Sequence, residues 1–336
     1  MRPSFVPRLV NDRFSDPGLF IPFLFEKRAL LFDLGDLHAL SSRDILKISH
    51  VFVTHTHIDH FIGFDHLLRI FLGRKKELHI YGPPDFFARV EGKLAGYTWN
   101  LVHEYPFELS LRITEVHEDR TFTKTYLCRK RFLPEQKETV RSFTGILLDE
   151  PSFRVEAVLL DHRIPCLGLS LVESYYINII KEELKKMGLP LGPWLTRLKK
   201  ALYEGRDPKS QFPVTWEESG LIRKVKTYVL GDLAERITRV SPGQKITYIT
   251  DVIGSTKNLN RIVTFAENAD YLFIEAAFLS AEKEIALQKY HLTAREAGEI
   301  ARRARAKNLV PFHFSPRYQH REEEIMAEAT EAFQQG

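Results

Sequence analysis

Residues 55–60 carry three histidines and one aspartate within six positions, His55-Thr56-His57-Ile58-Asp59-His60, directly after the apolar run Val51-Phe52-Val53. Such a segment constrains the fold, because it must leave a buried strand and yet hold four polar side chains together. Imidazole and carboxylate suit a borderline ion such as zinc, and residues two apart in an extended chain point the same way. We therefore expect His55 and His57 to face one ion and Asp59 and His60 to face a second. A solvated polar loop is the alternative, but these residues at these offsets arise rarely by chance.

Two ions with positions open for chemistry need more than four ligands, and three further apolar runs end in suitable side chains. Residues 155–160 lead into Asp161-His162, residues 245–250 into Asp251, and residues 308–312 into His313. Taken singly, each is as readily a cap or a turn residue. Three in succession behind the first motif favour metal ligands.

Composition agrees with a soluble globular enzyme. The chain has 336 residues, of which 44% are hydrophobic and 12% aromatic, so it can bury one large core or two modest ones, and disorder is not expected. Because no apolar run approaches the roughly 20 residues that span a bilayer, and residues 1–7 do not resemble a signal peptide, we expect a cytoplasmic protein. Cys128 and Cys166 are too few for a disulfide framework and are expected to be reduced thiols. Cys166 follows His162 closely, so it is either a pocket-lining thiol or a small buried hydrophobe.

Short strand-like runs are separated by helical segments. The runs at 29–32, 50–53, 77–81 and 109–113 predict one sheet, and those at 145–148, 154–160, 245–249 and 271–274 predict a second, with a helix over 294–306. Two half-buried sheets with helices outside make an α/β fold, the four-layer αβ/βα sandwich. We expect a single domain over residues 1–336. Residues 174–208 are the candidate for a protruding arm, because Gly188, Pro190, Gly192 and Pro193 break its helices.

The net charge of +4 is mild and would not by itself indicate nucleic acid. Basic residues gather at 181–206, where seven Lys and Arg face three acids. Such a patch could track phosphates, and the candidate contacts are Lys185, Lys186, Lys199 and Lys200. The alternative is a solvated pair of amphipathic helices, since apolar residues there fall near helical spacing.

Together these motifs resemble the metallo-β-lactamase superfamily and, within it, the ribonuclease Z group that trims the 3′ ends of precursor tRNA. Residues 55–60 fit the superfamily signature, and His162, Asp251 and His313 fit its later ligands. The stretch His291-Leu292-Thr293 with the helix that follows looks like the group's His-Ser-Thr loop, and residues 311–318 are similar to its His-Phe-Ser-x-Arg-Tyr motif. Residues 188–193 resemble the Gly-Pro arm with which the group grips tRNA. The resemblance covers roughly residues 29 to 320.

The resemblance implies a two-metal phosphodiesterase, with zinc as the expected metal. One ion would take His55, His57 and His162 and the other Asp59, His60 and His313, with Asp251 bridging; Asp59 counts with the catalytic residues. His291 is the candidate proton donor to the leaving oxygen, or else a residue capping the next helix. Glu275 would orient His291, or is an ordinary residue at a strand end.

Substrate identity stays open, because the loops near the substrate differ from the group's pattern. Residues 33–39 keep only an Asp and a Gly of the group's segment, and no Lys-, Arg- and Asn-rich loop is recognisable in residues 1–20. The alternatives to precursor tRNA are another phosphodiester substrate or a non-catalytic RNA-binding role, the last disfavoured by the complete ligand set. Arg317 and Tyr318 would contact phosphate or form a stabilising turn. The resemblance also implies a homodimer.

Overall fold

A computed structural model describes residues 4–135, 138–218 and 222–335 of the chain. The chain divides into two compact units. The larger unit comprises Phe5–Leu148, Val155–Leu171 and Lys245–Gly336, and the smaller unit is formed mainly by Asp149–Arg154 and Val172–Gln244. Every candidate metal ligand belongs to the larger unit, so that unit is described first.

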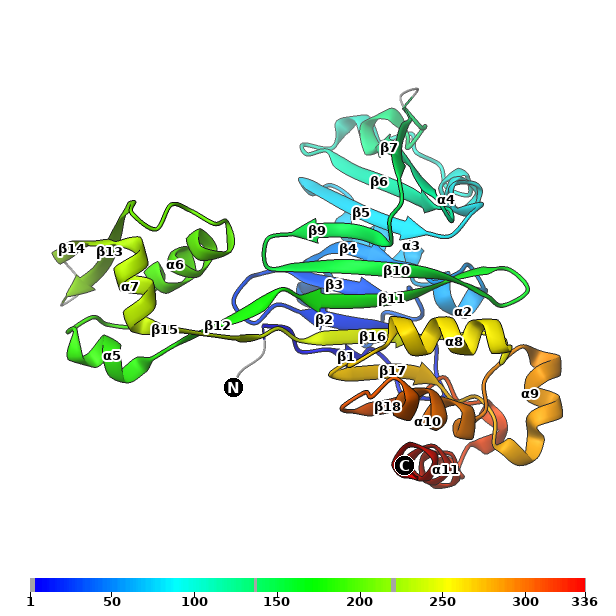
Figure 1. Ribbon diagram of the computed structural model, residues 1–336. Coiled ribbons are helices and arrows are strands. Elements are labelled where there is room, and N and C mark those ends of the chain that lie inside the picture. Colours follow the sequence, from blue (N-terminus) through cyan, green and yellow to red (C-terminus); the bar gives the residue numbers. More distant parts are fainter. Residues whose placement is uncertain (1–3, 136–137, 219–221, 336) are drawn as a thin grey trace. The chain divides into compact units, whose positions relative to one another are not determined.

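Eight strands form the first sheet of the larger unit in the order β1 to β8 (Figure 1). They are β1 (Arg8–Leu9), β2 (Leu19–Pro22), β3 (Ala29–Phe32), β4 (Ile48–Phe52), β5 (Lys76–Gly82), β6 (Leu109–Val116), β7 (Arg120–Leu127) and β8 (Thr139–Ser142). The central strands β3 to β6 run parallel, and the outer ones pair antiparallel. All four side chains of β3 are buried, as expected of a parallel strand covered on both faces. The strands predicted at 29–32, 50–53, 77–81 and 109–113 are thus confirmed as members of one sheet.

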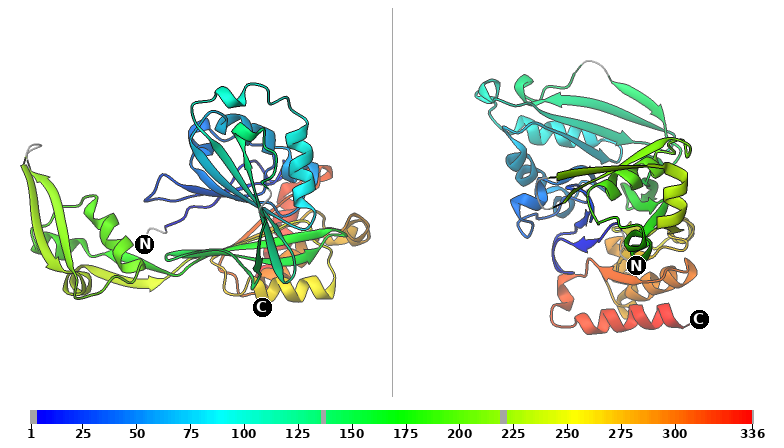
Figure 2. Two further views of the ribbon diagram at one scale, coloured as in Figure 1. Left: turned by 90° about the horizontal axis from the view of Figure 1, so that it is seen from above. Right: turned by 90° about the vertical axis from the view of Figure 1, so that its left-hand side faces the viewer.

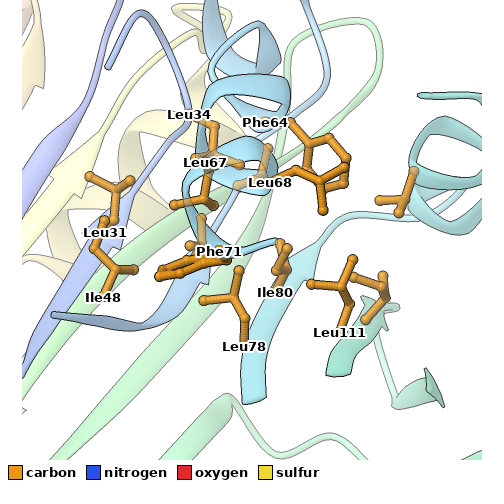
Figure 3. Close-up of a cluster of buried hydrophobic side chains, with 14 of the residues drawn as sticks. Leu31, Leu34, Ile48, Phe64, Leu67, Leu68, Phe71, Leu78, Ile80 and Leu111 are labelled. Atoms are coloured by element: carbon orange, nitrogen blue, oxygen red, sulfur yellow. The ribbon is translucent and has the colours of Figure 1, made fainter. Parts of the chain in front are cut away.

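Short helices cover the outer face of this sheet: α1 (Ser42–Ile45), α2 (Ile58–Phe61), α3 (Phe64–Phe71) and α4 (Phe86–Ala95). Helix α3 buries Phe64, Leu67, Leu68 and Phe71, which are spaced so that they share one helical face. Figure 3 shows these side chains directed at apolar residues of the sheet. Burying each such side chain stabilises the fold by about 1.5–3 kcal/mol, so the layer holds the loop between β4 and α3 firmly in place.

The second sheet has six strands in the order β18-β17-β16-β11-β10-β9. Their bounds are β9 (Ile146–Glu150), β10 (Phe153–Asp161), β11 (Pro165–Glu173), β16 (Lys245–Ile249), β17 (Tyr271–Glu275) and β18 (Leu309–Phe312). The second set of predicted strands falls in this sheet, which confirms that prediction as well. Strands β16, β17 and β18 are parallel, so their carboxyl ends meet at one edge.

Four helices accompany the second sheet: α8 (Thr256–Phe265), α9 (Lys283–Lys289), α10 (Ala294–Arg303) and α11 (Glu322–Gln334). Figures 1 and 2 show α11 lying beside α10 at the outer edge. Helix α10 begins at a capping box in which the Thr293 hydroxyl accepts from the backbone of Glu296, whose carboxylate accepts from the backbone of Thr293. That cap fixes where α10 starts and therefore where the preceding loop must end.

Aromatic side chains join the two sheets. The ring of Tyr248 in β16 lies 6.0 Å from that of Phe32 in β3 and 5.0 Å from that of Phe312 in β18. Two sheets packed face to face, each with helices outside, make the four-layer αβ/βα sandwich that the sequence predicts. In both sheets, the loops that follow the parallel strands lie at the same edge of the sandwich.

The smaller unit has its own apolar cluster around the buried Trp194. Its elements are β12 (Tyr175–Ile179), α5 (Lys181–Lys186), α6 (Trp194–Tyr203), β13 (Gln211–Glu218), β14 (Ile222–Val229), α7 (Leu230–Ile237) and β15 (Thr238–Pro242). Strand β12 pairs with β15, and β13 pairs with β14, in both cases antiparallel. The segment predicted as an arm, 174–208, lies within this unit, which continues to Gln244. Across the described ranges, no helix is both long and apolar enough to span a membrane.

Candidate metal centre and active site

The loop after β4 and the loops after β10, β16 and β18 bring together all seven side chains predicted as metal ligands. They form two groups, and within each group the donor atoms all lie within 4.8 Å of one another. They are His55, His57, His162 and Asp251 in the first group and Asp59, His60 and His313 in the second. The residues fall together because each follows a strand whose carboxyl end reaches this edge of the sandwich.

Asp251 lies between the two groups. Its Oδ2 is 3.4 Å from Nε2 of both His55 and His162, and its Oδ1 is 3.5 Å from Nε2 of His60 and 3.1 Å from Nδ1 of His313. Two ligand atoms bound to one ion at about 2.0–2.2 Å with tetrahedral angles stand about 3.4 Å apart. One carboxylate oxygen therefore faces each group at a separation that fits a shared ion.

Three of the ring nitrogens in these groups are buried without a hydrogen-bond partner: His55 Nε2, His60 Nε2 and His313 Nδ1. A buried nitrogen without a partner is costly unless something binds it. The opposite nitrogens of two rings are engaged. Asp33 accepts from His60 Nδ1 at 2.9 Å, and the Tyr290 carbonyl accepts from His162 Nδ1 at 2.9 Å. Each of these bonds directs the Nε2 lone pair into the centre, so the residues present fit divalent metal ions.

The charge states of four of these side chains already suit metal binding, whereas those of His60 and His313 do not. Burial would lower the pKa of His60 and His313, but the charge of Asp251 raises both, so each ring loses a proton when an ion binds. Burial lowers the pKa of His55, His57 and His162 below the ordinary value, which keeps their rings neutral, the form that binds a metal. Burial would raise the pKa of Asp59, but the hydrogen bond to His313 and the charge of His60 outweigh it and lower that pKa to about 2. The first group thus offers neutral imidazoles and the second an ionised carboxylate.

Asp33 organises the centre although the sequence did not single it out as a functional residue. Its carboxylate is fully buried and accepts from Thr54 N at 2.7 Å, from the Tyr248 hydroxyl at 3.0 Å and from His60. The signal was available, because Asp33 directly follows the apolar run 29–32 just as His162, Asp251 and His313 follow theirs. The backbone at Asp33, Asp251 and His313 has positive φ, at 61°, 51° and 57° respectively.

His291 and Glu275 form a pair beside this centre. His291 Nδ1 lies 2.7 Å from Glu275 Oε2, and because a carboxylate only accepts, Nδ1 carries the proton and Nε2 faces away from the carboxylate. Glu275 is fully buried, and its Oε1 accepts from Val252 N at 2.8 Å. The His291 ring centroid lies 5.3 Å from that of His162 and 5.5 Å from that of His313. Burial would lower the pKa of His291, but the charge of Glu275 and the hydrogen bond to it raise that pKa above its ordinary value.

The alternative role for His291, capping the next helix, is excluded by the structure. The cap of α10 is Thr293, whose side chain accepts from Glu296 N. Glu275 likewise does more than end a strand, since its carboxylate holds both His291 and the backbone at Val252.

The two residues expected near phosphate behave differently. Arg317 lines a cavity of about 410 Å³ beside the centre and donates to Glu282 at 2.9 Å. Tyr318 is only 1% exposed, and its hydroxyl accepts from Leu279 N at 3.2 Å and donates to Glu282. A direct contact of Tyr318 with substrate is therefore wrong; this side chain stabilises the turn that carries Arg317.

The four lysines predicted to bind RNA lie on α5 and α6. Lys185, Lys186 and Lys200 are exposed, with Lys186 2.6 Å from Glu183 and Lys200 3.7 Å from Glu204. Lys199 is half-buried, and its ammonium lies 4.8 Å from the centroid of the Tyr176 ring. Helix α6 also buries Trp194, Leu198 and Ala201 on its other side, so an amphipathic helix and a basic surface coexist here.

Cys166 is fully buried, and its thiol lies 3.4 Å from the Thr250 carbonyl oxygen. This burial agrees with the interpretation of Cys166 as a small buried hydrophobe.

Comparison with known proteins identifies the class to which this fold and centre belong. A Beta-lactamase superfamily domain matches residues 31–155 and 229–314, which is more than half of the chain. The chain therefore belongs to the β-lactamase superfamily. Within it, the chain is 31% identical over 297 residues to ribonuclease Z of Latilactobacillus sakei, covering 86% of this chain and 77% of that protein. It is 29% identical over 306 residues to ribonuclease Z of Deinococcus radiodurans, covering 90% and 87%. The chain is a member of the ribonuclease Z family.

Solved structures agree on the fold. The metallo-beta-lactamase fold protein YhfI from Bacillus subtilis has a TM-score of 0.53 at 16% identity, with 95% of this chain and 86% of that chain covered. The short form of human tRNase Z has a TM-score of 0.51 at 20% identity, with 94% and 93% covered. The metallo-β-lactamase fold predicted from the sequence is confirmed.

Proposed function

We propose that this chain is a metal-dependent endoribonuclease that cleaves precursor tRNA at its 3′ end. Membership of the ribonuclease Z family supports the reaction class. Within the site, the proposal depends most on the hydrogen-bonded pair of His291 and Glu275 next to a complete set of metal donors. A protein that only bound RNA would have no use for a proton donor beside two metal sites.

In this proposal, His55, His57 and His162 hold one ion and Asp59, His60 and His313 hold the other, with Asp251 shared between them. The ions are two per chain and are Zn²⁺, because imidazole-rich sites with a few carboxylates favour that metal. When bound, such a pair supplies a water activated at neutral pH and neutralises charge on the phosphodiester.

His291 supplies the proton that the leaving ribose oxygen needs. Its Nδ1 proton is held by Glu275, so the reacting proton is the one on Nε2. The raised pKa favours the protonated ring, the form that can act as an acid. Glu275 thereby both orients the ring and favours its charged form.

The smaller unit would contribute affinity for tRNA. Lys185, Lys186, Lys199 and Lys200 of the proposed arm, 174–208, belong to a unit in which thirteen Lys and Arg at 172–244 face nine Asp and Glu. Contacts of this kind go to phosphates and set register without reading sequence. Arg317, which lines the cavity beside the centre, would meet a phosphate close to the reacting one.

A second candidate function is hydrolysis of a phosphodiester other than precursor tRNA. One observation favours it: Asp16, in the N-terminal loop, lines the cavity, whereas the family's corresponding loop is rich in Lys, Arg and Asn. A carboxylate at that position would repel an approaching phosphate. A phosphate would therefore approach the centre from the side of the cavity lined by Lys289 and Arg317.

The two functions separate in one experiment. Purified protein of measured metal content is incubated with precursor tRNA that carries a 3′ trailer, and with bis(p-nitrophenyl) phosphate. We expect about two zinc ions per chain and one cut in the tRNA. Chelation should remove the ions and abolish the cleavage, and added zinc should restore it. If the small phosphodiester is hydrolysed while the tRNA stays uncut, the second function is favoured. Less than one ion per chain in well-folded protein would contradict the two-ion centre.

The homodimer and the cytoplasmic location stay predictions. Light scattering of the purified chain tests the homodimer, and fractionation of cells tests the location.

A further inference from the structure

The cavity beside the centre is larger than the reacting group needs. Its volume of about 410 Å³ lies in the range of about 300–1,000 Å³ that is typical of sites for whole small molecules. Asp59, His291 and His313 line it together with residues from the N-terminal loop, from α9 and from the turn at Pro316–Tyr318. It therefore has room for a nucleotide unit next to the phosphodiester that reacts.

One lysine and one arginine line this cavity, and they differ in what they already bind. Arg317 donates to Glu282 at 2.9 Å, and its guanidinium lies 5.6 Å from the centroid of the Phe278 ring. Lys289, the last residue of α9, is exposed. Among the residues that the structure describes, no carboxylate lies within ion-pair distance of its ammonium. Lys289 is thus the cation that remains available for a ligand.

The backbone that carries Lys289 is fixed to the metal centre. Tyr290 caps helix α9 and has a positive φ of 64°, and His291 N closes the turn by donating to the Ala286 carbonyl at 2.9 Å. The Tyr290 carbonyl in turn accepts from His162 Nδ1 at 2.9 Å. Lys289 is therefore two residues from the proposed proton donor, and the residue between them holds a candidate metal ligand.

The acidic side chains of the cavity indicate where in it a phosphate can bind. Asp16 and Asp59 both line the cavity, and Asp16 Oδ2 also accepts from Asp36 N at 3.2 Å. A phosphate is repelled by these carboxylates and attracted by an ammonium without a carboxylate partner. In a chain of nucleotides, a phosphate next to the reacting one is a group of this kind.

We infer that Lys289 is a substrate-positioning residue that binds a non-reacting phosphate of the RNA adjacent to the scissile phosphodiester. The inference rests on the proposed function, since a substrate with a single phosphodiester has no such neighbour. Lys289 would fix where along the strand the reacting bond lies, because its own position is fixed relative to His291 and His162.

The test compares Lys289→Ala with Lys289→Arg, which keeps the charge, and with Lys75→Ala as a matched loss of one exposed lysine. Lys75 precedes β5, at the end of the parallel strands opposite the centre. Two properties are measured: cleavage of precursor tRNA and of bis(p-nitrophenyl) phosphate, and binding of a short RNA by chelator-treated protein across a series of salt concentrations.

For Lys289→Ala we expect KM for tRNA and Kd for the RNA to rise about 3- to 10-fold with kcat nearly unchanged, and the salt dependence of binding to fall by about one counterion. The effect on bis(p-nitrophenyl) phosphate should be much smaller, Lys289→Arg should restore most of the affinity, and Lys75→Ala should match the wild type. Equal losses on both substrates, or an unchanged salt dependence, would overturn the role of Lys289. Wild-type protein that neither binds nor cleaves RNA would instead overturn the proposed function, and that result is visible before any variant is made.

Discussion

The Asp33 carboxylate holds the His60 imidazole at 2.9 Å between Oδ2 and Nδ1, and neither side chain is exposed to solvent. Asp33 also accepts from Thr54 N and from the Tyr248 hydroxyl, so one buried carboxylate connects the metal loop after β4 with the second sheet. Because Nδ1 is engaged in this bond, His60 Nε2 is the ring nitrogen left to bind a metal ion. The orientation of a candidate ligand thus depends on a residue that binds no ion itself.

Asp33→Asn should weaken metal binding by about 10- to 100-fold, the usual cost of losing a carboxylate behind a ligating histidine. Zinc affinity measured with a competing chelator checks this. Asp119→Asn, which removes an exposed carboxylate paired with Arg120, should leave the affinity unchanged. Equal affinity of the Asp33 variant and the wild type would show that the ring of His60 is held by packing alone.

His291→Ala should lower kcat on precursor tRNA by about 10²–10⁴-fold while leaving the metal content intact, because a ribose oxygen leaves poorly without a proton. With bis(p-nitrophenyl) phosphate the loss should be much smaller, since nitrophenolate leaves unaided. Steady-state rates on both substrates and elemental analysis give the answer. A loss of metal in the variant would mean that His291 shapes the centre instead of protonating the product.

Glu275→Gln should shift the pH dependence of tRNA cleavage. The charge of Glu275 and its hydrogen bond raise the pKa of His291, so the variant has the lower pKa. The acid form is lost as pH rises through that pKa, and the alkaline limb of kcat should therefore move to lower pH. A profile of kcat from pH 6 to 10 measures the shift, and an alkaline limb that stays in place would assign it to another group.

Charge reversal at Lys185 and Lys200 should raise KM for precursor tRNA and reduce its salt dependence, while the rate on bis(p-nitrophenyl) phosphate stays the same. Reversal is preferable to deletion of 174–208, because that segment contributes Trp194 and Leu198 to the apolar cluster of the smaller unit. The matched control is reversal of Lys27 and Lys75, two exposed lysines of the larger unit. A similar KM increase in the control would reveal a general effect of net charge.

Gly63→Ala should destabilise the fold by about 1–3 kcal/mol, the usual cost of overpacking. A Cβ at Gly63 would lie 2.1 Å from the Gly35 carbonyl oxygen and 3.0 Å from that of Leu34, which the backbone cannot vacate cheaply. Gly92→Ala is the contrast, because Gly92 lies inside α4 with open space around it, and there alanine should stabilise by about 0.5–1 kcal/mol. Unfolding in urea measures both, and equal stability of the two variants would argue against the close contact.

The strands and the candidate ligands could be predicted because both follow from local pattern. Val51, Phe52 and Val53 are fully buried, and a histidine two residues later must then lie at the strand end. His162, Asp251 and His313 follow the same rule. Long-range hydrogen bonds have no such pattern, and the contacts of Asp33 with His60 and Tyr248 join residues 27 and 215 positions apart.

Two other features escaped prediction for different physical reasons. The hairpin of β13 and β14 was not among the predicted strands, although polar and apolar residues alternate in β13. Its burial of Phe212 and Val214 in the cluster around Trp194 depends on contacts distant in sequence. The capping role considered for His291 was plausible by position, but Thr293 is the better cap, because its hydroxyl completes a box with Glu296. Competition between two neighbouring candidates is decided by geometry that the sequence does not contain.

The positive φ values at Asp33, Asp251 and His313 set the chemistry of this protein against its own stability. Each left-handed residue costs on the order of 1 kcal/mol, which glycine at the same position would avoid. Three residues of the centre thus occupy backbone positions at which a mutation to glycine relieves strain while removing a functional group.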